Sequence, residues 1–228
     1  MSVEIGDDFQ LYRSLRNAQT DRSGLYPMFD VSSSYVDGSN GFWICGFNSV
    51  GEIIHTQAVR LLDIGTQTLR QHLSDHRHKY ITPDTTPDPD KTCYEGPQAL
   101  SRVTGKVCYQ GDFWLPSRGL GGPRSQGATQ ILSRLLHEMV YHAWRPDYMF
   151  ALVPERLAAK GAHLRYGYTH CEPGRWIGPD AQVTEKDYLI WMSRADMAHQ
   201  IAEQPVTLSA GSQISPVAES VMAIDTKG

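Results

Sequence analysis

The stretch from Val107 to Trp144 constrains the fold of this chain most strongly. An apolar segment ends at Pro116, a loop rich in glycine and arginine follows, and a long helix is predicted over residues 127–144. A strand, a glycine-rich loop and a helix N-terminus in this order supply free N–H groups and the positive end of a helix dipole, which favour phosphate. The apolar residues of the helix form one broad stripe: Ile131, Leu132, Leu135, Leu136, Met139, Val140 and Ala143.

The loop contains two arginine- and glycine-bearing segments, Arg118–Pro123 and Arg124–Thr129. The second lies at the helix entry, where Arg124 provides a cation and Gly127 lets the backbone approach a ligand closely. We therefore expect a diphosphate site here, although a solvated glycine-rich loop is the alternative. Neither GxxxxGK[ST] nor GxGxxG occurs, which disfavours nucleotide hydrolysis and Rossmann-type binding.

The chain before this stretch is predicted to supply most of a sheet. A short strand over residues 2–5 precedes a helix over 7–22 and a loop over 26–40. A β-hairpin follows, with strands over 41–47 and 52–62. The second hairpin strand has no cleanly apolar face, so we expect both of its faces to be covered.

A polar helix is predicted over residues 65–80, and it carries His72 and His76 on one face, with His78 nearby. A metal site would need a third converging ligand. We interpret these histidines as a solvated helix face and predict no metal site. The proline-rich residues 82–90 are expected to form an exposed loop.

Apolar runs also define the chain after the central stretch. The run over residues 148–153 is typical of a strand buried on both faces. The remaining predicted elements are a short helix over 155–160, an extended segment over 163–170, a strand over 187–193, and a terminal helix that Ser193 or Asp196 caps and that ends at Glu203. We expect one domain over residues 1–204 and a C-terminal tail over 205–228.

Composition narrows the class of protein. The 228 residues are 40% hydrophobic and 20% charged, which fits a globular chain. The net charge of −4 disfavours a nonspecific nucleic-acid binder. No membrane partner or secretory signal is predicted. The four cysteines are scattered, which favours a reduced, cytoplasmic protein: they are Cys45, Cys93, Cys108 and Cys171.

This order of elements resembles the GNAT superfamily of acyl-CoA N-acyltransferases. In that family an [RQ]xxGx[GA] loop holds the cofactor, and here Arg124 and Gly127 match it while Thr129 stands where Gly or Ala is usual. The resemblance implies an α/β (α+β) fold with a mixed, mostly antiparallel sheet flanked by helices, and it implies acetyl-CoA or another acyl-CoA as cofactor. The residues that it implies in cofactor binding are Trp114, Leu115, Arg118, Arg124, Ser125, Gln126, Gly127, Ala128 and Thr129.

Residues 151–167 also resemble the corresponding stretch of acyl-homoserine-lactone synthases, which share a GNAT-like fold. The arginine, tryptophan and aspartate pattern of those enzymes has no clear counterpart in residues 10–40. Autoinducer synthesis is therefore an alternative and not the main prediction.

Acyl transfer needs a neutral amine, a donor for the oxyanion and a proton for the leaving thiolate. Backbone N–H groups near Trp114 and Leu115 are the expected oxyanion donors. By spacing, the acidic residue of the family falls on Tyr109, and Asp112 is the nearest carboxylate. His55 on the hairpin is the third candidate catalytic residue, with a packing or surface role as the alternative. Tyr109 is not a base at neutral pH unless its pKa is strongly perturbed.

One further position departs from the family pattern, because Leu157 stands where many members have a tyrosine. Tyr166 or Tyr168, on the later predicted strand, is a further candidate to face the cleft, and a packing or surface role is the alternative for each. The resemblance predicts an acyltransferase that acts on a small-molecule or peptide amine, with a homodimer as one expected assembly. A noncatalytic GNAT-like module that binds a ligand or a protein is the alternative from a different class.

Overall fold

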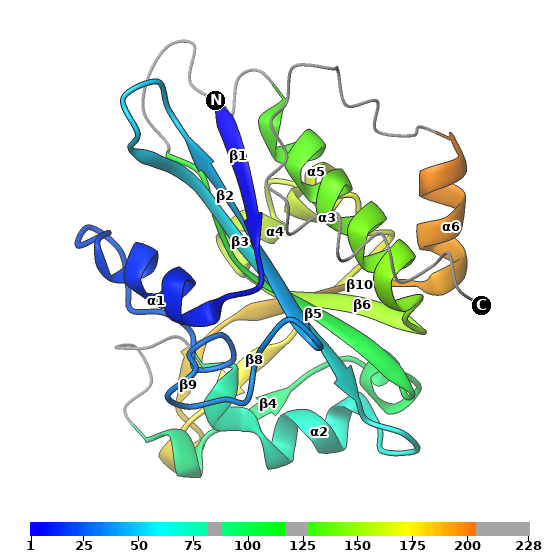
Figure 1. Ribbon diagram of the computed structural model, residues 1–228. Coiled ribbons are helices and arrows are strands. Elements are labelled where there is room, and N and C mark those ends of the chain that lie inside the picture. Colours follow the sequence, from blue (N-terminus) through cyan, green and yellow to red (C-terminus); the bar gives the residue numbers. More distant parts are fainter. Residues whose placement is uncertain (82–87, 117–126, 204–228) are drawn as a thin grey trace.

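The structure is a computed structural model that describes residues 1–81, 88–116 and 127–203. Its main sheet has seven strands in the order β1-β2-β3-β5-β6-β10-β7 (Figure 1). All neighbours pair antiparallel except β5 and β6, which pair parallel. The predicted mixed, mostly antiparallel sheet is confirmed. The strands are β1 (Ser2–Gly6), β2 (Gly41–Phe47), β3 (Ile53–Asp63), β5 (Lys106–Trp114), β6 (Tyr148–Pro154), β7 (His170–Glu172) and β10 (Asp187–Ser193).

The predicted hairpin is confirmed, because β2 and β3 pair from Gly41 with Arg60 to Phe47 with Ile53. Both faces of β3 are covered, as its mixed pattern indicated. Residues 55–60 of this strand are all buried, although they include His55, Thr56 and Gln57. Polar side chains in a buried strand need internal partners, and those partners are part of the site described below.

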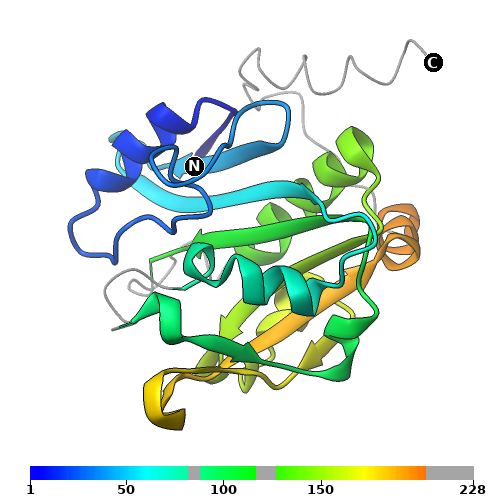
Figure 2. The same cartoon turned by 90° about the horizontal axis from the view of Figure 1, so that it is seen from below.

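Helices α1 (Phe9–Asn17) and α2 (Leu69–Asp75) cover one face of the sheet (Figure 2). The Asp8 side chain caps α1 by accepting from the N–H groups of residues 10 and 11. The helix predicted over 7–22 is shorter in the structure at both ends, because it begins after Asp8 and ends at Asn17. The core on this face joins both helices to the strands, through Phe9, Tyr12, Leu69, Leu73, Tyr109 and Phe150 among others.

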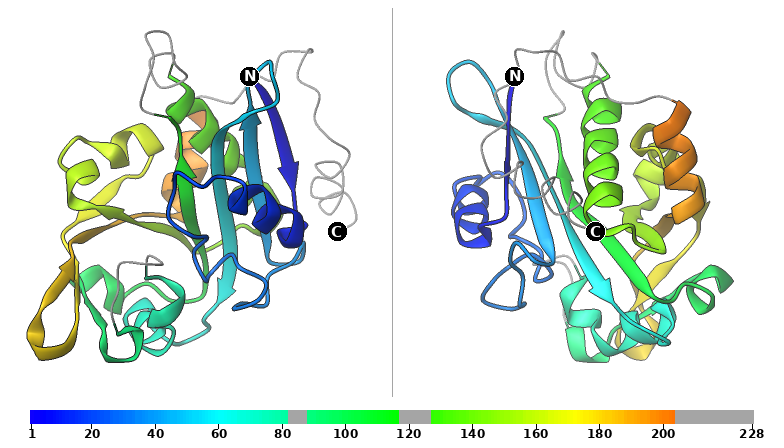
Figure 3. Two further views of the ribbon diagram at one scale, coloured as in Figure 1. Left: turned by 90° about the vertical axis from the view of Figure 1, so that its left-hand side faces the viewer. Right: turned by 45° about the vertical axis from the view of Figure 1, so that its right-hand side comes forward.

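Helices α3 (Ala128–Trp144) and α6 (Arg194–Glu203) lie on the opposite face (Figure 3). Both helices were predicted with these bounds to within a residue. Ser193 and Asp196 cap α6 reciprocally, because each backbone N–H donates to the side chain of the other. The second core fills this face and includes Ile44, Leu136, Val140, Met149, Ile190 and Met197.

The extended segment predicted over 163–170 is wrong in its first part. The short helix α4 (Glu155–Ala158) is followed by a second short helix, α5 (Ala162–Tyr166). Gly167, with φ of +81°, ends α5, and strand β7 begins only three residues later. Because α5 has only five residues and only one of them is buried, its apolar pattern is too short to show a helical period, and the sequence does not distinguish it from a strand.

The solvated face predicted for the histidines of α2 is wrong for His72. This side chain is buried, and its Nε2 atom lies 2.9 Å from the hydroxyl of Tyr80. Burial lowers the pKa of His72 to about 4. Among the described residues, no group of three or more His, Cys, Asp or Glu side chains is placed to hold a metal ion.

A second, three-stranded sheet was not predicted. It has the order β4-β8-β9 and is antiparallel. Its strands are β4 (Cys93–Glu95), β8 (Arg175–Ile177) and β9 (Val183–Glu185). Short 3-10 helices in the described parts of the chain are η1 (Arg77–Lys79), η2 (Pro89–Lys91), η3 (Gln98–Ser101) and η5 (Pro179–Ala181). Most of the predicted loop over 82–90 and the tail over 205–228 lie outside the described residues. In the described parts of the chain, every helix is too short or too polar to cross a bilayer.

Candidate functional site

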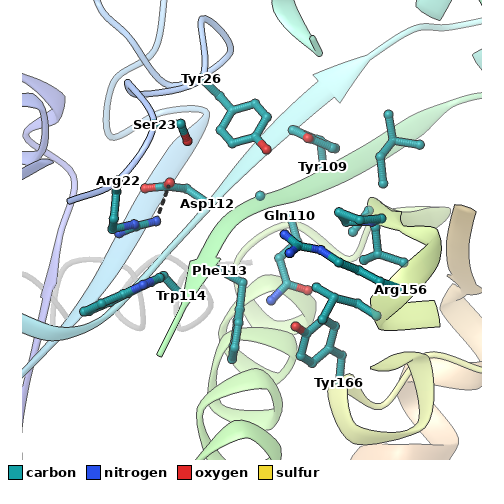
Figure 4. Close-up of a pocket in the computed structure, with 16 residues that line it drawn as sticks. Arg22, Ser23, Tyr26, Tyr109, Gln110, Asp112, Phe113, Trp114, Arg156 and Tyr166 are labelled. Atoms are coloured by element: carbon teal, nitrogen blue, oxygen red, sulfur yellow. Dashed lines mark hydrogen bonds and ion pairs between the residues drawn. The ribbon is translucent and has the colours of Figure 1, made fainter. Parts of the chain in front are cut away.

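Strands β5 and β6 run parallel for only three residue pairs, which end at Tyr109 and Phe150. Beyond them, β5 continues to Trp114 and β6 to Pro154 without pairing with each other. A cavity of about 310 Å³ lies where the two strands have separated (Figure 4). It is lined by residues of both strands, of the segment after α1, and of α4 and α5.

A β-bulge accompanies the separation. Across β3 and β5, Ala58 pairs with Gly111 but Thr56 pairs with Trp114, so β5 has one extra residue. Asp112 lies in the bulge with φ of +52°, a conformation that few residues other than glycine adopt. The Thr56 hydroxyl donates to the Asp112 carbonyl at 2.9 Å and holds this conformation. Because a bulge bends its strand, it directs the end of β5 away from β6.

The carboxylate of Asp112 is enclosed by donors. It accepts from the Tyr12 hydroxyl at 2.5 Å, from Arg16 Nε at 2.6 Å and from Arg22 Nη2 at 3.0 Å. The side chains of Asp112 and Arg16 are each 1% exposed. Burial, together with the neighbouring carboxylate, raises the pKa of Tyr12 well above its usual value. The phenol therefore stays protonated and acts as the hydrogen-bond donor to Asp112.

Arg22 connects this buried anion to the cavity. One of its nitrogens donates to the Thr56 hydroxyl at 2.9 Å, and its guanidinium lies 4.8 Å from the centre of the Trp114 ring. A guanidinium over an indole face is attracted to the ring quadrupole. Asp112, Arg22 and Trp114 are therefore one connected unit on one side of the cavity (Figure 4).

Two of the three predicted catalytic residues, Asp112 and Tyr109, line the cavity. Tyr109 is buried and stacks on Phe29, with the ring centres 5.7 Å apart. Burial raises the pKa of Tyr109 well above its usual value. The phenol is therefore protonated at neutral pH, which makes it a donor and not a base.

His55, the third predicted catalytic residue, is not among the residues that line the cavity. Its Nδ1 atom donates to the Trp114 carbonyl at 2.9 Å, and this partner assigns the tautomer. Its Nε2 atom is buried without a hydrogen-bond partner in the described part of the chain. Burial lowers the pKa of His55 to about 4, so the ring is neutral and holds the end of β5 in place.

Gln110 belongs to a polar network that links the cavity to α3, and the sequence did not indicate it. Its amide nitrogen donates to Gln57 at 2.9 Å, and its amide oxygen accepts from the Tyr168 hydroxyl at 2.8 Å. Gln57 in turn donates to the Leu132 carbonyl within α3 at 2.8 Å. A polar residue at an inward position of a buried strand was the only available signal.

The predicted cofactor loop is described only at its two ends. On the strand side, Leu115 is buried and packs with Ala128 and Leu132 of α3. On the helix side, Gly127 has φ of +74° at the N-terminus of α3, followed by Ala128 and Thr129, and no described side chain caps this end. The predicted residues Arg118, Arg124, Ser125 and Gln126 lie outside the described residues.

The far side of the cavity is formed by α4 and α5. Arg156 of α4 extends into the cavity in Figure 4, and Leu157, for which the resemblance implied a tyrosine, also lines it. Tyr166 of α5 also lines the cavity, with its ring 4.6 Å from that of Phe113. Neither Arg22 nor Arg156 was predicted as a site residue, because each lies in a predicted helix whose local pattern carries no sign of a ligand.

No family model matches the sequence, and no curated protein matches it. Several solved structures do match. A spermidine N-acetyltransferase variant, SpeG from Vibrio cholerae, has a TM-score of 0.44 at 8% identity, covering 88% of this chain and 99% of that one. FeeM, an N-acyl amino acid synthase from uncultured soil microbes, has a TM-score of 0.43 at 12% identity, covering 84% and 91%.

A third match is BjaI, a CoA-dependent acyl-homoserine lactone synthase solved with SAM and isopentyl-CoA. Its TM-score is 0.41 at 9% identity, and the match covers 96% of this chain and 98% of that one. The predicted likeness to N-acetyltransferases and to acyl-homoserine-lactone synthases is confirmed, since both kinds are among the matches. These likenesses are remote, so the chemistry of the site is inferred from its own geometry.

Proposed function

We propose that this protein is an acyltransferase that takes an acyl group from acyl-CoA and transfers it to an amine. The observation that carries the proposal is the separation of β5 from β6 after Tyr109 and Phe150. It leaves the facing edges of two strands without a partner strand, beside a cavity of about 310 Å³. An unpaired strand edge binds extended chains that carry amides.

The pantetheine arm of CoA is such a chain. Its two amides match the alternating donors and acceptors of a strand edge, and residues 110–114 of β5 offer that edge. The arm would enter between the strands and place its thioester in the cavity. The sulfur would then lie near the residues contributed by α4, α5 and the segment after α1.

The N-terminus of α3 supports the same orientation. Leu115, one residue beyond β5, contacts the first turn of α3, so the strand edge and the helix N-terminus are adjacent. Free N–H groups at a helix N-terminus bind phosphate. A pyrophosphate held there by residues 124–129 would put the pantetheine arm in line with β5.

The chain also offers groups for the transfer itself. When the amine attacks the thioester carbonyl, negative charge develops on its oxygen, and backbone N–H groups near Trp114 and Leu115 are the proposed donors to it. The C–S bond then breaks, and the thiolate needs a proton. We assign this proton to Tyr166, whose ring lies in the cavity wall against Phe113.

Asp112 receives a different role from that of a base. Its two carboxylate oxygens already accept hydrogen bonds from two arginines and one tyrosine, so neither oxygen is left to take a proton from the amine. We propose that Asp112 fixes Arg22, and through it Trp114, beside the cavity. The proton of the attacking amine then passes to water.

Two measurements test the proposal. Calorimetry should show CoA binding, and thiol release from acetyl-CoA or hexanoyl-CoA should increase when an acceptor amine is added. Tyr166→Phe should slow turnover about 100-fold without changing CoA affinity, which is the low end of the range for general acid catalysis. CoA binding without thiol release for any amine would instead identify a noncatalytic module, and no CoA binding at millimolar concentration would contradict the proposal.

A further inference from the structure

The cavity contains an excess of positive charge. The charged residues in its lining are Arg22, Arg156 and Asp112, and Arg16 lies directly behind Asp112. This excess contrasts with the whole chain, whose net charge is −4. A concentration of cations in one cavity of an acidic protein favours an anionic ligand.

The single carboxylate of the lining is not available to a ligand cation. Both oxygens of Asp112 already accept from Tyr12, Arg16 and Arg22 at 3.0 Å or less. A polyamine in the cavity would therefore meet no unpaired carboxylate in the lining, and its additional ammonium groups would be repelled by Arg22 and Arg156. The positive charge of the cavity lining therefore disfavours polycations as acceptors.

The two cavity arginines differ in what they bind. The guanidinium of Arg22 is held by Asp112, Thr56 and Gln19. Arg156 has no hydrogen-bond or ion-pair partner within the described part of the chain, and it points into the cavity (Figure 4). The adjacent Glu155 does not neutralise it, because Glu155 pairs with Lys186 at 3.4 Å.

A guanidinium that a ligand covers loses its water, and this loss is compensated only when the ligand supplies an anion. We propose that the acceptor amine carries a carboxylate, as an amino acid does, and that Arg156 binds this carboxylate. The proposal rests on the proposed acyltransferase activity. It restricts the acceptor to amino acids and related amino-carboxylates.

The test compares acceptors of one shape that differ in charge. Leucine, leucinamide and 3-methylbutylamine form one series, phenylalanine, phenylalaninamide and phenethylamine form a second, and spermidine represents polycations. Thiol release from acetyl-CoA and hexanoyl-CoA gives kcat and KM for each acceptor, and mass spectrometry identifies the product. We expect the amino acid to exceed its amide and its decarboxylated amine by about 10- to 100-fold in kcat/KM, the scale of a hydrogen bond between charged groups.

Arg156→Gln assigns the preference to one side chain. It should raise KM for the amino acid about 10- to 100-fold and leave KM for the amines that lack a carboxylate nearly unchanged. Lys160→Gln is the matched control, because it also removes one positive charge, four residues after Arg156. Lys160 is exposed and is not among the residues that line the cavity. This control should retain the full preference for the amino acid.

Several results would overturn the proposal. Equal or faster transfer to the decarboxylated amines or to spermidine would contradict the proposal that the acceptor needs a carboxylate. The same result would still establish the acyltransferase activity. An equal loss in Arg156→Gln for acceptors with and without a carboxylate would show that Arg156 has a structural role. A preference of wild type, but not of Arg156→Gln, for succinyl-CoA over acetyl-CoA with 3-methylbutylamine would place the carboxylate on the acyl donor. No transfer to any amine would overturn both proposals together.

Discussion

Arg16 donates to Asp112 at 2.6 Å across a separation of 96 residues, and each of the two side chains is only 1% exposed. The pair joins α1 to the bulge of β5, so it connects the packing of the first helix with the position of the candidate site. A second arginine, Arg22, and the Tyr12 hydroxyl complete the coordination of the carboxylate. The cluster has more positive than negative groups, and its single anion holds it together.

Removing that anion should destabilise the protein strongly. Asp112→Asn keeps the shape of the side chain but leaves Arg16 buried without a counter-charge, and the free energy of unfolding should fall by about 3–5 kcal/mol. Denaturant unfolding measures this change. Asp30→Asn is the control, since Asp30 pairs with an arginine that is 39% exposed and should contribute at most about 1 kcal/mol. A loss for Asp112→Asn as small as that of the control would show that the cluster is not a stabilising element.

The helix-entry loop gives a prediction about cofactor affinity. Arg124→Ala should weaken CoA binding by about 1.5–3 kcal/mol, the scale of a hydrogen bond to a charged group. Arg118→Ala should have a smaller effect, because its segment ends in Pro123, which lacks an N–H. Titration calorimetry of both variants decides between the two segments. Unchanged affinity in Arg124→Ala would remove the loop from the cofactor site.

Buried histidines should make the protein less stable in acid. Burial lowers the pKa of both His55 and His137 to about 4, whereas the unfolded chain has the ordinary value of about 6.5. Stability is full above pH 6.5, decreases as the unfolded state takes up protons, and levels off below pH 4. Each residue should contribute a loss of about 3 kcal/mol over this interval.

A substitution isolates one of these contributions. His137→Gln should reduce the dependence of the unfolding free energy on pH between 6.5 and 4, measured in denaturant at several pH values. His142→Gln, on an exposed position of the same helix, should leave the dependence unchanged. If both variants retain the slope of the wild type, His137 is not neutral in the folded state.

Asp187 should act in the opposite direction. It is buried, its Oδ1 atom has no partner among the described residues, and burial raises its pKa to about 7. A raised pKa stabilises the fold below about pH 4, and this contribution of roughly 4 kcal/mol is lost as the pH rises through 7. Asp187→Asn should therefore equal the wild type near pH 4 and exceed it in stability at pH 8. A variant that is no more stable at pH 8 would contradict this assignment.

The main sheet was predictable because its strands are marked locally. The apolar run over 148–153 and the paired runs over 41–47 and 52–62 are long enough for their pattern to identify them. The three-stranded sheet was not predictable, since each of its strands has three residues and supports no periodicity. Its strands also come from distant parts of the chain, and only the tertiary fold brings them together.

The candidate site divides in a similar way. Asp112, Tyr109 and Trp114 were predicted as site residues because the family resemblance places them on the central strand, and all three line the cavity. Their partners were missed, because Arg22 and Arg156 reach the cavity from segments far apart in sequence. An ion pair between residues 16 and 112 leaves no trace in local composition, so the sequence alone suggested a free carboxylate where the structure has a coordinated one.

The short pairing of β5 with β6 also has a consequence for folding. Strands β1, β2, β3 and β5 find all their other partners within residues 2–114, and β6, β10 and β7 find theirs within residues 148–193. The main sheet is thus two antiparallel units that share a seam of three residue pairs. Each unit can assemble its own ladder independently, and the seam joins them. The cavity, in which we propose that the ligand binds, lies at the boundary between these two antiparallel units.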